Sequence, residues 1–349
     1  MSRRIALSAL AALAAMLAAC TPAPDLSPLE STGGAIVAAK IRGEPPLDPD
    51  HANWDSAAPA EAVLYPQTAV PPAAGAGEVT AIQVQALHNG EVLAVRLEWN
   101  DPLAAKQRGI GRFADAAAVQ WPMDREHDEL PYVGMGQPGN PVAVWLWRAS
   151  GEVQNLAAEG FGTLTAQPDE TLAARGEWRD GTWRVVFRRP LSGPESAPAG
   201  GQALLPVALA AWNGEDGERN GMKHLSPWRV VYLEGREAST DAMARLADRP
   251  AAGNPQRGKA LMAEKGCAAC HAYPDNPAQP AVGPNLTYAG GVHRSDYLRQ
   301  SVTQPSAVIV PGKGYSTETD GGPVSLMPPL QGTEQEVEDL VAYLATLRH

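Results

Sequence analysis

The spacing of two cysteines constrains this 349-residue chain more than any other feature of its sequence. Cys267 and Cys270 are followed at once by His271, in the run Cys-Ala-Ala-Cys-His. This is the attachment sequence of a c-type haem, whose two vinyl groups bond the thiols while the adjacent histidine ligates the iron. A redox Cys-x-x-Cys pair or half of a zinc site is the alternative, but neither explains the residues around the motif. We therefore expect one covalent haem c in the last third of the chain.

Helix signals stand on both sides of the motif. Asn254 and Pro255 are typical of a helix N-cap and first turn, and Gly266 is typical of a helix end. Thr333 and Glu336 form a capping box. The apolar residues that follow recur at helical spacing, and these are Val337, Leu340, Val341, Leu344 and Leu347. The pattern predicts one helix before the haem motif and another at the end of the sequence.

The loop between these helices is Gly283-Pro284-Asn285-Leu286. It resembles the Gly-Pro-x-Leu loop of class I cytochromes c. The resemblance implies that residues 254–349 form such a domain, which is small and all-α, and that the carbonyl group of Pro284 orients His271.

The second axial ligand of the haem c iron is predicted by elimination. Residues 254–349 contain two methionines, and Met262 lies too close in sequence to the haem motif to reach the opposite face. Met327 lies in a proline-rich extended loop that can present its thioether to the iron. His293 is the competing ligand, and it would give a lower reduction potential. A methionine that only fills the core is the remaining alternative for Met327.

The first residues read as an export signal. Arg3 and Arg4 precede an apolar stretch over residues 5–19 that is too short to span a bilayer. The stretch ends Leu-Ala-Ala-Cys20, which resembles the lipobox of bacterial lipoproteins. We therefore expect a signal peptide at 1–19, lipidation of Cys20, a flexible tether at 20–34 and a periplasmic protein anchored to the inner or outer membrane. An ordinary cleaved signal with an incidental Cys20 is the alternative.

Composition separates a second domain from the first. All nine tryptophans lie between residues 35 and 235, and the 34 glycines and 32 prolines favour a turn-rich β architecture. We expect a β domain at 35–237 and a linker at 238–253, which is rich in Ala, Asp, Arg and Pro. The formal charge of −11 excludes a nucleic-acid partner, since no basic excess exists to neutralise phosphates.

Two hairpins fix the expected strand registers in this domain. The turn Asn89-Gly90 pairs Ala86 with Leu93, and the turn Asp180-Gly181 places Trp178 opposite Trp183 and Glu177 opposite Arg184. Further strand-like runs are Val142 to Arg148, Ala203 to Trp212 and Arg229 to Glu234. Short strands with frequent turns predict an antiparallel β-sandwich.

Several spaced motifs in the β domain carry a family resemblance. They are Leu-Glu-Trp-Asn-Asp-Pro at 97–102, Pro-Tyr-Val-Gly-Met-Gly at 131–136, Pro-Val-Ala-Val-Trp-Leu-Trp-Arg at 141–148 and Asn-Gly-Met-Lys-His-Leu-Ser-Pro-Trp at 220–228. Together they resemble the haem b-binding gamma subunits of ethylbenzene dehydrogenase, dimethylsulfide dehydrogenase and the selenate and chlorate reductases. This chain departs from those subunits by its appended cytochrome c segment and lipobox.

The resemblance implies one non-covalent haem b, held in the sandwich between a methionine and a lysine. The matching residues are Met135 and Lys223. His224 is the competing ligand, but adjacent residues on a strand point to opposite faces, so only one of the two can enter the pocket. Core packing of Met135 and a solvated Lys223 are the non-functional alternatives.

The combined features predict an electron-transfer protein with haem b and haem c and no substrate chemistry of its own. The family implies a molybdenum catalytic subunit and an iron-sulfur subunit as partners, with a further redox carrier beyond the cytochrome. A cytochrome c fused to a carbohydrate- or ligand-binding sandwich, with a single haem, is the alternative. A self-contained haem enzyme would need an open coordination position on one iron.

Overall fold

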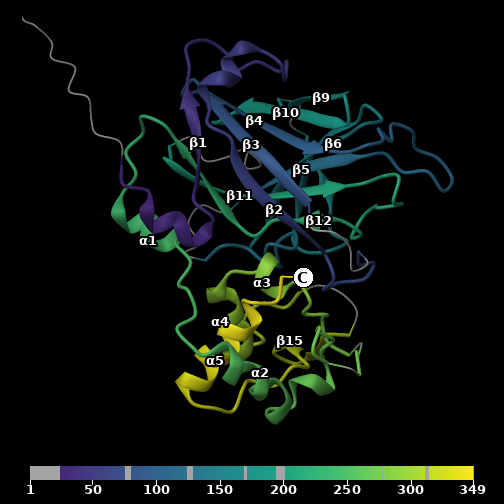
Figure 1. Cartoon of the computed structure of the whole chain (residues 1–349), viewed down its shortest axis with the longest axis vertical. Helices are drawn as coiled ribbons and strands as arrows, with labels where there is room; N and C mark the ends of the chain where they lie inside the picture. The colour runs from purple at the N-terminus through teal and green to yellow at the C-terminus, as the bar shows by residue number, and fades with distance from the viewer. Residues whose placement is uncertain are drawn as a thin grey trace, which may run out of the picture.

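The computed structural model describes residues 24–74, 80–123, 129–168, 171–193, 201–276, 278–280, 282–310 and 314–348. The predicted signal peptide and Cys20 lie outside these ranges. Figure 1 shows the strands gathered in one body and the helices α2 to α5 in a second body beneath it. No helix among the described residues combines the length and the apolar character that a membrane crossing requires.

The first body is a β-sandwich, as the sequence predicts. Its strands are β1 (Ala35–Lys40), β2 (Ala60–Pro66), β3 (Thr80–His88), β4 (Val92–Asn100), β5 (Ala116–Pro122), β6 (Val142–Arg148), β7 (Val153–Ala158), β8 (Thr165–Ala166), β9 (Ala173–Arg179), β10 (Thr182–Pro190), β11 (Leu204–Trp212), β12 (His224–Leu225) and β13 (Arg229–Leu233). The path of hydrogen-bonded neighbours is β8-β7-β6-β5-β11-β12-β2-β3-β4-β10-β9, and every pair along it is antiparallel. Strand β1 departs from this pattern, because it runs parallel to both β3 and β13.

Small and bulky side chains alternate along β5, β6 and β11, and this alternation determines what each face of the sheet contains. On β6, Trp145 and Trp147 point into the core shared with β3, β4 and β10, whereas Val144 and Leu146 point to the other face. The short residues on that outer face are the alanines of β5 and β11, namely Ala116, Ala118, Ala208 and Ala210. The sheet therefore has one bulky face, which builds the core, and one face with room above it.

One predicted hairpin register is confirmed and the other is wrong. Trp178 pairs with Trp183 and Glu177 with Arg184, as expected. Ala86 pairs with Val95 rather than Leu93, a shift of two residues. The turn is longer than Asn-Gly because the Asn89 side chain accepts hydrogen bonds from two backbone N–H groups, at 2.9 and 2.8 Å. Since an even shift keeps every side chain on its face, the predicted core survives the error.

Two segments expected to lie outside the domains, the flexible tether and the linker, are partly helical. Within the expected tether, residues 27–32 form the 3₁₀ helix η1 (Ser27–Thr32), whose Leu29 is fully buried. Within the expected linker, α1 (Thr240–Leu246) buries Met243 in the same small cluster. Both apolar side chains cover Val230 and Tyr232 of β13. Residues 27–32 are therefore not a flexible tether, and the linker contains a packed helix, because each segment has an apolar side chain that the sandwich can bury.

Among the described residues, the second body contains five helices, of which only the first and the last were predicted. They are α2 (Pro255–Glu264), η3 (Cys267–Ala269), α3 (Ala289–Val292), α4 (Ser295–Thr303) and α5 (Glu334–Leu344); η2 (Ala52–Ser56) belongs to the sandwich. Asn254 caps α2 and the Thr333–Glu336 capping box begins α5, as expected. Helix α5 crosses α2 at Gly258, where any side chain would overlap the Asp339 backbone. A hairpin of β14 (Ser316–Thr319) and β15 (Gly322–Ser325) is an addition to the all-α prediction.

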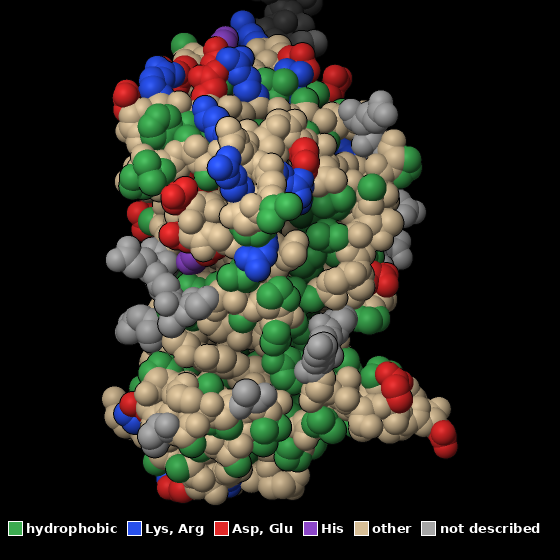
Figure 2. All heavy atoms as spheres, turned by 90° about the vertical axis from the view of Figure 1, so that its right-hand side faces the viewer, with side chains coloured by type: hydrophobic (Ala, Val, Ile, Leu, Met, Phe, Trp, Pro, Cys, Tyr) green, Lys and Arg blue, Asp and Glu red, His purple; other side chains and the backbone are tan. Residues whose placement is uncertain are grey.

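The two bodies share an apolar interface. Tyr65 of β2 packs against Tyr288 and Val292 in one cluster, with the two tyrosine ring centroids 6.3 Å apart. Gly291 is required there, because a Cβ at this position would lie 2.5 Å from the Tyr65 ring. On the face drawn in Figure 2, hydrophobic side chains run from the sandwich to the helical body, while charged ones gather mostly at the far end of the sandwich.

Candidate functional site

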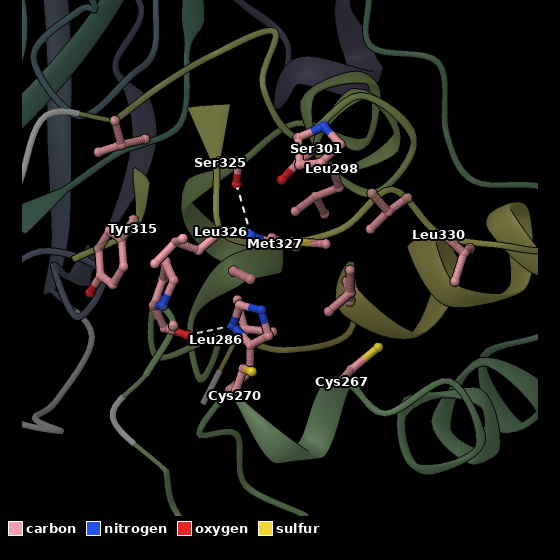
Figure 3. Close-up of a pocket in the computed structure, with 18 of the residues that line it drawn as sticks. Cys267, Cys270, Leu286, Leu298, Ser301, Tyr315, Ser325, Leu326, Met327 and Leu330 are labelled. Carbon is pink, nitrogen blue, oxygen red and sulfur yellow. Dashed lines mark hydrogen bonds between the residues drawn. The ribbon is translucent and has the colours of Figure 1, made fainter. Parts of the chain in front are cut away.

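The predicted haem c residues line one cavity in the helical body. The cavity has a volume of about 440 Å³, and its walls include Cys267, Cys270, His271, Pro284 and Met327. Figure 3 shows Met327 reaching into this space from the side opposite to Cys270. The structure therefore brings together the five residues that the sequence and the cytochrome resemblance indicated.

The orientation of His271 is fixed by its neighbours. Its Nδ1 lies 2.9 Å from the carbonyl oxygen of Pro284, the contact that the cytochrome resemblance implied (Figure 3). A Cβ at Gly283 would lie 2.8 Å from His271 Cε1, so only glycine allows the loop to pass this close to the ring. Burial lowers the pKa of His271 and favours the neutral ring. With Nδ1 occupied, Nε2 is the nitrogen left to bind a metal.

Met327, the predicted second ligand of the haem c iron, and its competitor His293 both line this cavity. Met327 is part-buried against the helical core, and its backbone N–H donates to Ser325 Oγ at 3.1 Å. Met262 is fully buried in α2 and lines the same cavity. His293 lines it too, but its ring contacts Tyr297 and Tyr132, with centroids 4.5 and 5.5 Å apart. Burial lowers the pKa of His293 to about 4.

A second cavity lies on the outer face of the sandwich. Its volume is about 760 Å³, and both Met135 and Lys223 line it. The alanines of β5 and β11 form its floor, with Val144, Leu146 and Leu156 beside them. Larger side chains at the alanine positions would fill this space. The cavity thus follows directly from the alternation of small and bulky residues along the sheet.

Met135 is held in an unusual backbone conformation. Its φ is +78°, in the left-handed region that costs free energy for a residue with a Cβ. Two hydrogen bonds hold the turn, from Gly136 N–H to the Tyr132 carbonyl and from Gly160 N–H to the Met135 carbonyl, both 2.7 Å long. Gly134 is packed under the Tyr132 and Phe161 rings, where a Cβ would clash. The strain falls on the residue whose side chain lines the cavity.

Lys223 is buried without a counter-charge. Its Nζ lies 5.6 Å from the ring centroid of Phe161 and 5.4 Å from that of Trp212. Among the residues that the structure describes, no carboxylate pairs with this amine and no acceptor receives a hydrogen bond from it. Burial alone lowers its pKa from 10.5 to about 8. An amine that loses its proton easily and faces a cavity fits a metal-ligand role.

The structure separates Lys223 from its neighbour His224. The Nδ1 atom of His224 lies 3.0 Å from Glu218 Oε1, and the ring does not line the sandwich cavity. Lys223 stands immediately before β12, whose first residue is His224. Of these two neighbouring residues, only Lys223 lines the sandwich cavity.

Comparisons with known proteins match both bodies. The ethylbenzene dehydrogenase family model matches residues 51–171, and the cytochrome c model matches residues 255–348. The chlorate reductase subunit gamma of Ideonella dechloratans is 34% identical over 238 residues, which cover 66% of this chain and 97% of that protein. The dimethylsulfide dehydrogenase subunit gamma of Rhodovulum sulfidophilum is 32% identical over 151 residues, which cover 41% of this chain and 56% of that protein.

The chain belongs to the family of these gamma subunits. Its C-terminal cytochrome c domain extends that family's sandwich, and the two together make it a haem-binding electron-transfer protein. Among solved structures, a family 9 carbohydrate-binding module from Caldicellulosiruptor kristjanssonii in complex with cellotriose is 13% identical with a TM-score of 0.39, covering 59% of this chain and 96% of that one. This likeness assigns no ligand to the chain.

The sequence analysis did not identify the alanine floor of the sandwich cavity or the side chains at the contact between the two domains. The signal for the floor was present, because alanines alternate with core residues in the runs 116–119 and 207–211. Tyr132 and Phe161 gave no such signal, since their positions depend on how the loops fold over the sheet. The gamma-subunit resemblance found the two side chains at the ends of the cavity but not its shape.

We predict that the Lys223 amine titrates near pH 8 in protein prepared without haem. The folded pKa lies below the unfolded value of 10.5, so the unfolding free energy should rise as pH increases from about 8 to 10.5. Lys223→Met should remove this dependence and stabilise the cofactor-free protein at pH 7 by about 3 kcal/mol. NMR of labelled lysines gives the pKa, and denaturant unfolding gives the slope. A Lys223 signal that titrates near 10.5 would contradict the burial argument.

Proposed function

We propose that this chain is an exported, lipid-anchored protein with two haems, which relays electrons for a molybdenum-containing oxidoreductase. Haem b would be held by Met135 and Lys223, and haem c by Cys267, Cys270, His271 and Met327. When bound, each haem supplies a one-electron carrier, and the protein supplies ligation, burial and orientation. The chain itself would carry no substrate chemistry.

One observation carries the assignment of the second haem. A buried amine without a counter-charge and a strained methionine line the same cavity in the sandwich. Neither feature has a packing reason, since an apolar side chain at 223 and a glycine at 135 would each have a lower free-energy cost. A metal that accepts a thioether and a neutral amine accounts for both at once.

The covalent haem rests on a separate set of contacts. The two cysteines of the attachment motif, the oriented histidine and a thioether border one apolar cavity. His/Met ligation with a largely buried haem favours a positive reduction potential. Such a site suits a relay to a further redox carrier outside the complex.

The proposed partners follow from the relatives. The Ideonella dechloratans and Rhodovulum sulfidophilum proteins are named as gamma subunits of chlorate reductase and dimethylsulfide dehydrogenase. We extend this to a complex with a molybdenum catalytic subunit and an iron-sulfur subunit. The lipobox at Cys20 would hold that complex at a membrane surface facing the periplasm.

The carbohydrate-binding alternative needs exposed aromatic rings, and the tryptophans do not provide them. Seven are buried, and Trp178 and Trp212 are half-buried. Trp212 borders the sandwich cavity beside Lys223 rather than forming a flat platform. The aromatic residues of the sandwich therefore support a core and a cofactor wall, which favours the relay.

We predict that mature protein contains one haem that acidic acetone extracts and one that it leaves covalently bound. Lys223→Ala should lose the extractable haem and keep the covalent one, as measured by pyridine haemochrome spectra. His224→Gln is the matched control, because it changes the adjacent residue outside the cavity and should keep both haems. Loss of haem b from the His224 variant alone would assign that ligand to His224. Wild-type protein with only covalent haem would overturn the relay.

We predict that Met327→Ala opens one coordination position on the haem c iron and lowers its reduction potential. The reduced variant should bind CO readily at neutral pH, whereas wild-type protein should bind it poorly. His293→Leu is the control for the competing ligand and should leave the haem c spectrum and potential close to wild type. The opposite result in the two variants would make His293 the ligand and Met327 a core residue.

We predict that Cys20→Ser moves the expressed protein from the detergent phase to the aqueous phase in a detergent partition. The wild-type mature chain should begin at Cys20 and carry lipid, which mass spectrometry of its N-terminal peptide measures. Efficient cleavage of the Cys20→Ser precursor, together with a lipid-free wild-type protein, would favour an ordinary cleaved signal instead.

A further inference from the structure

The two cofactor cavities approach each other at the interface between the bodies. Val70, in the segment that leaves β2, lines both of them. A small cavity of about 20 Å³ lies beside it. Tyr132 and His293 border this cavity and the haem c cavity, while Phe161 and Leu225 border it and the sandwich cavity. The two sites thus share side chains in their walls at this point.

Three rings from the two bodies pack together at this point. Tyr132 belongs to the strained Met135 turn, since its carbonyl accepts the Gly136 N–H. Its ring centroid lies 5.5 Å from that of His293 and 5.4 Å from that of Tyr297. His293 follows α3 and Tyr297 lies in α4 of the cytochrome domain. A side chain next to one cofactor cavity therefore touches side chains at the wall of the other.

The contact between the bodies is fixed by more than these rings. Thr68 Oγ1 donates to the Asn285 carbonyl at 3.2 Å, and Tyr315 OH donates to the Ala69 carbonyl at 2.7 Å. Both bonds anchor the segment that contains Val70. The bodies are joined in addition by the packing of Tyr65 on Gly291 and by an apolar cluster that contains side chains from both bodies. The cytochrome domain is docked on the sandwich and is not held by the linker alone.

We propose that Val70, Tyr132 and His293 form a fixed junction through which an electron passes directly between the two cofactor sites of one chain. This inference rests on the proposed function, because it requires both haems. One iron is oxidised as the other is reduced, a single electron moves, and no bond or proton changes place. The opposing arrangement is a mobile cytochrome domain that must leave the sandwich before it exchanges electrons.

The first part of the test changes the docking without touching a cavity wall. Gly291→Val places a side chain against the Tyr65 ring and should push the bodies apart. Gly321→Val is the matched control in the same domain, since a Cβ there meets only Thr319 Oγ1 at 3.8 Å. Tyr65→Leu is a milder interface variant if Gly291→Val does not fold. Small-angle X-ray scattering reports whether each variant keeps the docked shape, independently of its redox state.

The rate is measured by injecting one electron with a light pulse and following the absorbance of each haem. Since the rate between held reactants depends steeply on their separation, Gly291→Val should slow the exchange severalfold, and Gly321→Val should not. Tyr132→Leu should also slow it while scattering still shows the docked shape. Wild-type rates in the undocked variant would overturn the junction and leave the relay intact. A wild-type protein with both haems and no exchange between them would overturn the relay itself.

Discussion

The alternation of small and bulky side chains along β5, β6 and β11 is the constraint on which the rest of the structure depends. Tryptophans on one face complete the sandwich core, so the opposite face is free to carry alanines. A strand has only two faces, and a residue that fills the core cannot also fill the cavity. The space over the alanines is therefore a consequence of how the core is packed. The loops that bear Met135 and Lys223 close over this space.

The residues at the ends of that cavity carry the costs that ordinary folding avoids. A lysine is buried with no carboxylate beside it, and a methionine adopts a left-handed backbone conformation. Each costs about 1–3 kcal/mol of folding free energy, which is a sizeable part of the net stability of a domain. Strained or desolvated groups of this kind gather at functional sites because surrounding contacts hold them there. Here the glycines on both sides of Met135 and the aromatic rings around Lys223 are those contacts.

The sequence was most informative where function depends on residues close together in the chain. The haem motif, the capping box at Thr333 and the Trp178–Trp183 pair all follow from local spacing, and the structure has each of them. Prediction failed where one side chain altered a local rule, as when Asn89 closed a longer turn. The helices at 27–32 and 240–246 were also not predicted, because the surface that Leu29 and Met243 cover includes β13, which is not adjacent to either helix in the sequence. The meeting of Tyr132 with His293 depends on docking between two domains, which no local pattern specifies.

Joining both cofactor sites in one chain changes what the interface must achieve. Residues 247–253 connect α1 to the cytochrome domain, and so short a connection keeps that domain at an effective concentration on the order of millimolar beside the sandwich. Two separate proteins would need a large interface to stay together at ordinary concentrations. Within one chain, a modest apolar contact around Tyr65 and Gly291 is enough to keep the domains docked. The contact can therefore be small, and its residues can serve to bring the two cavities close together rather than to supply binding energy.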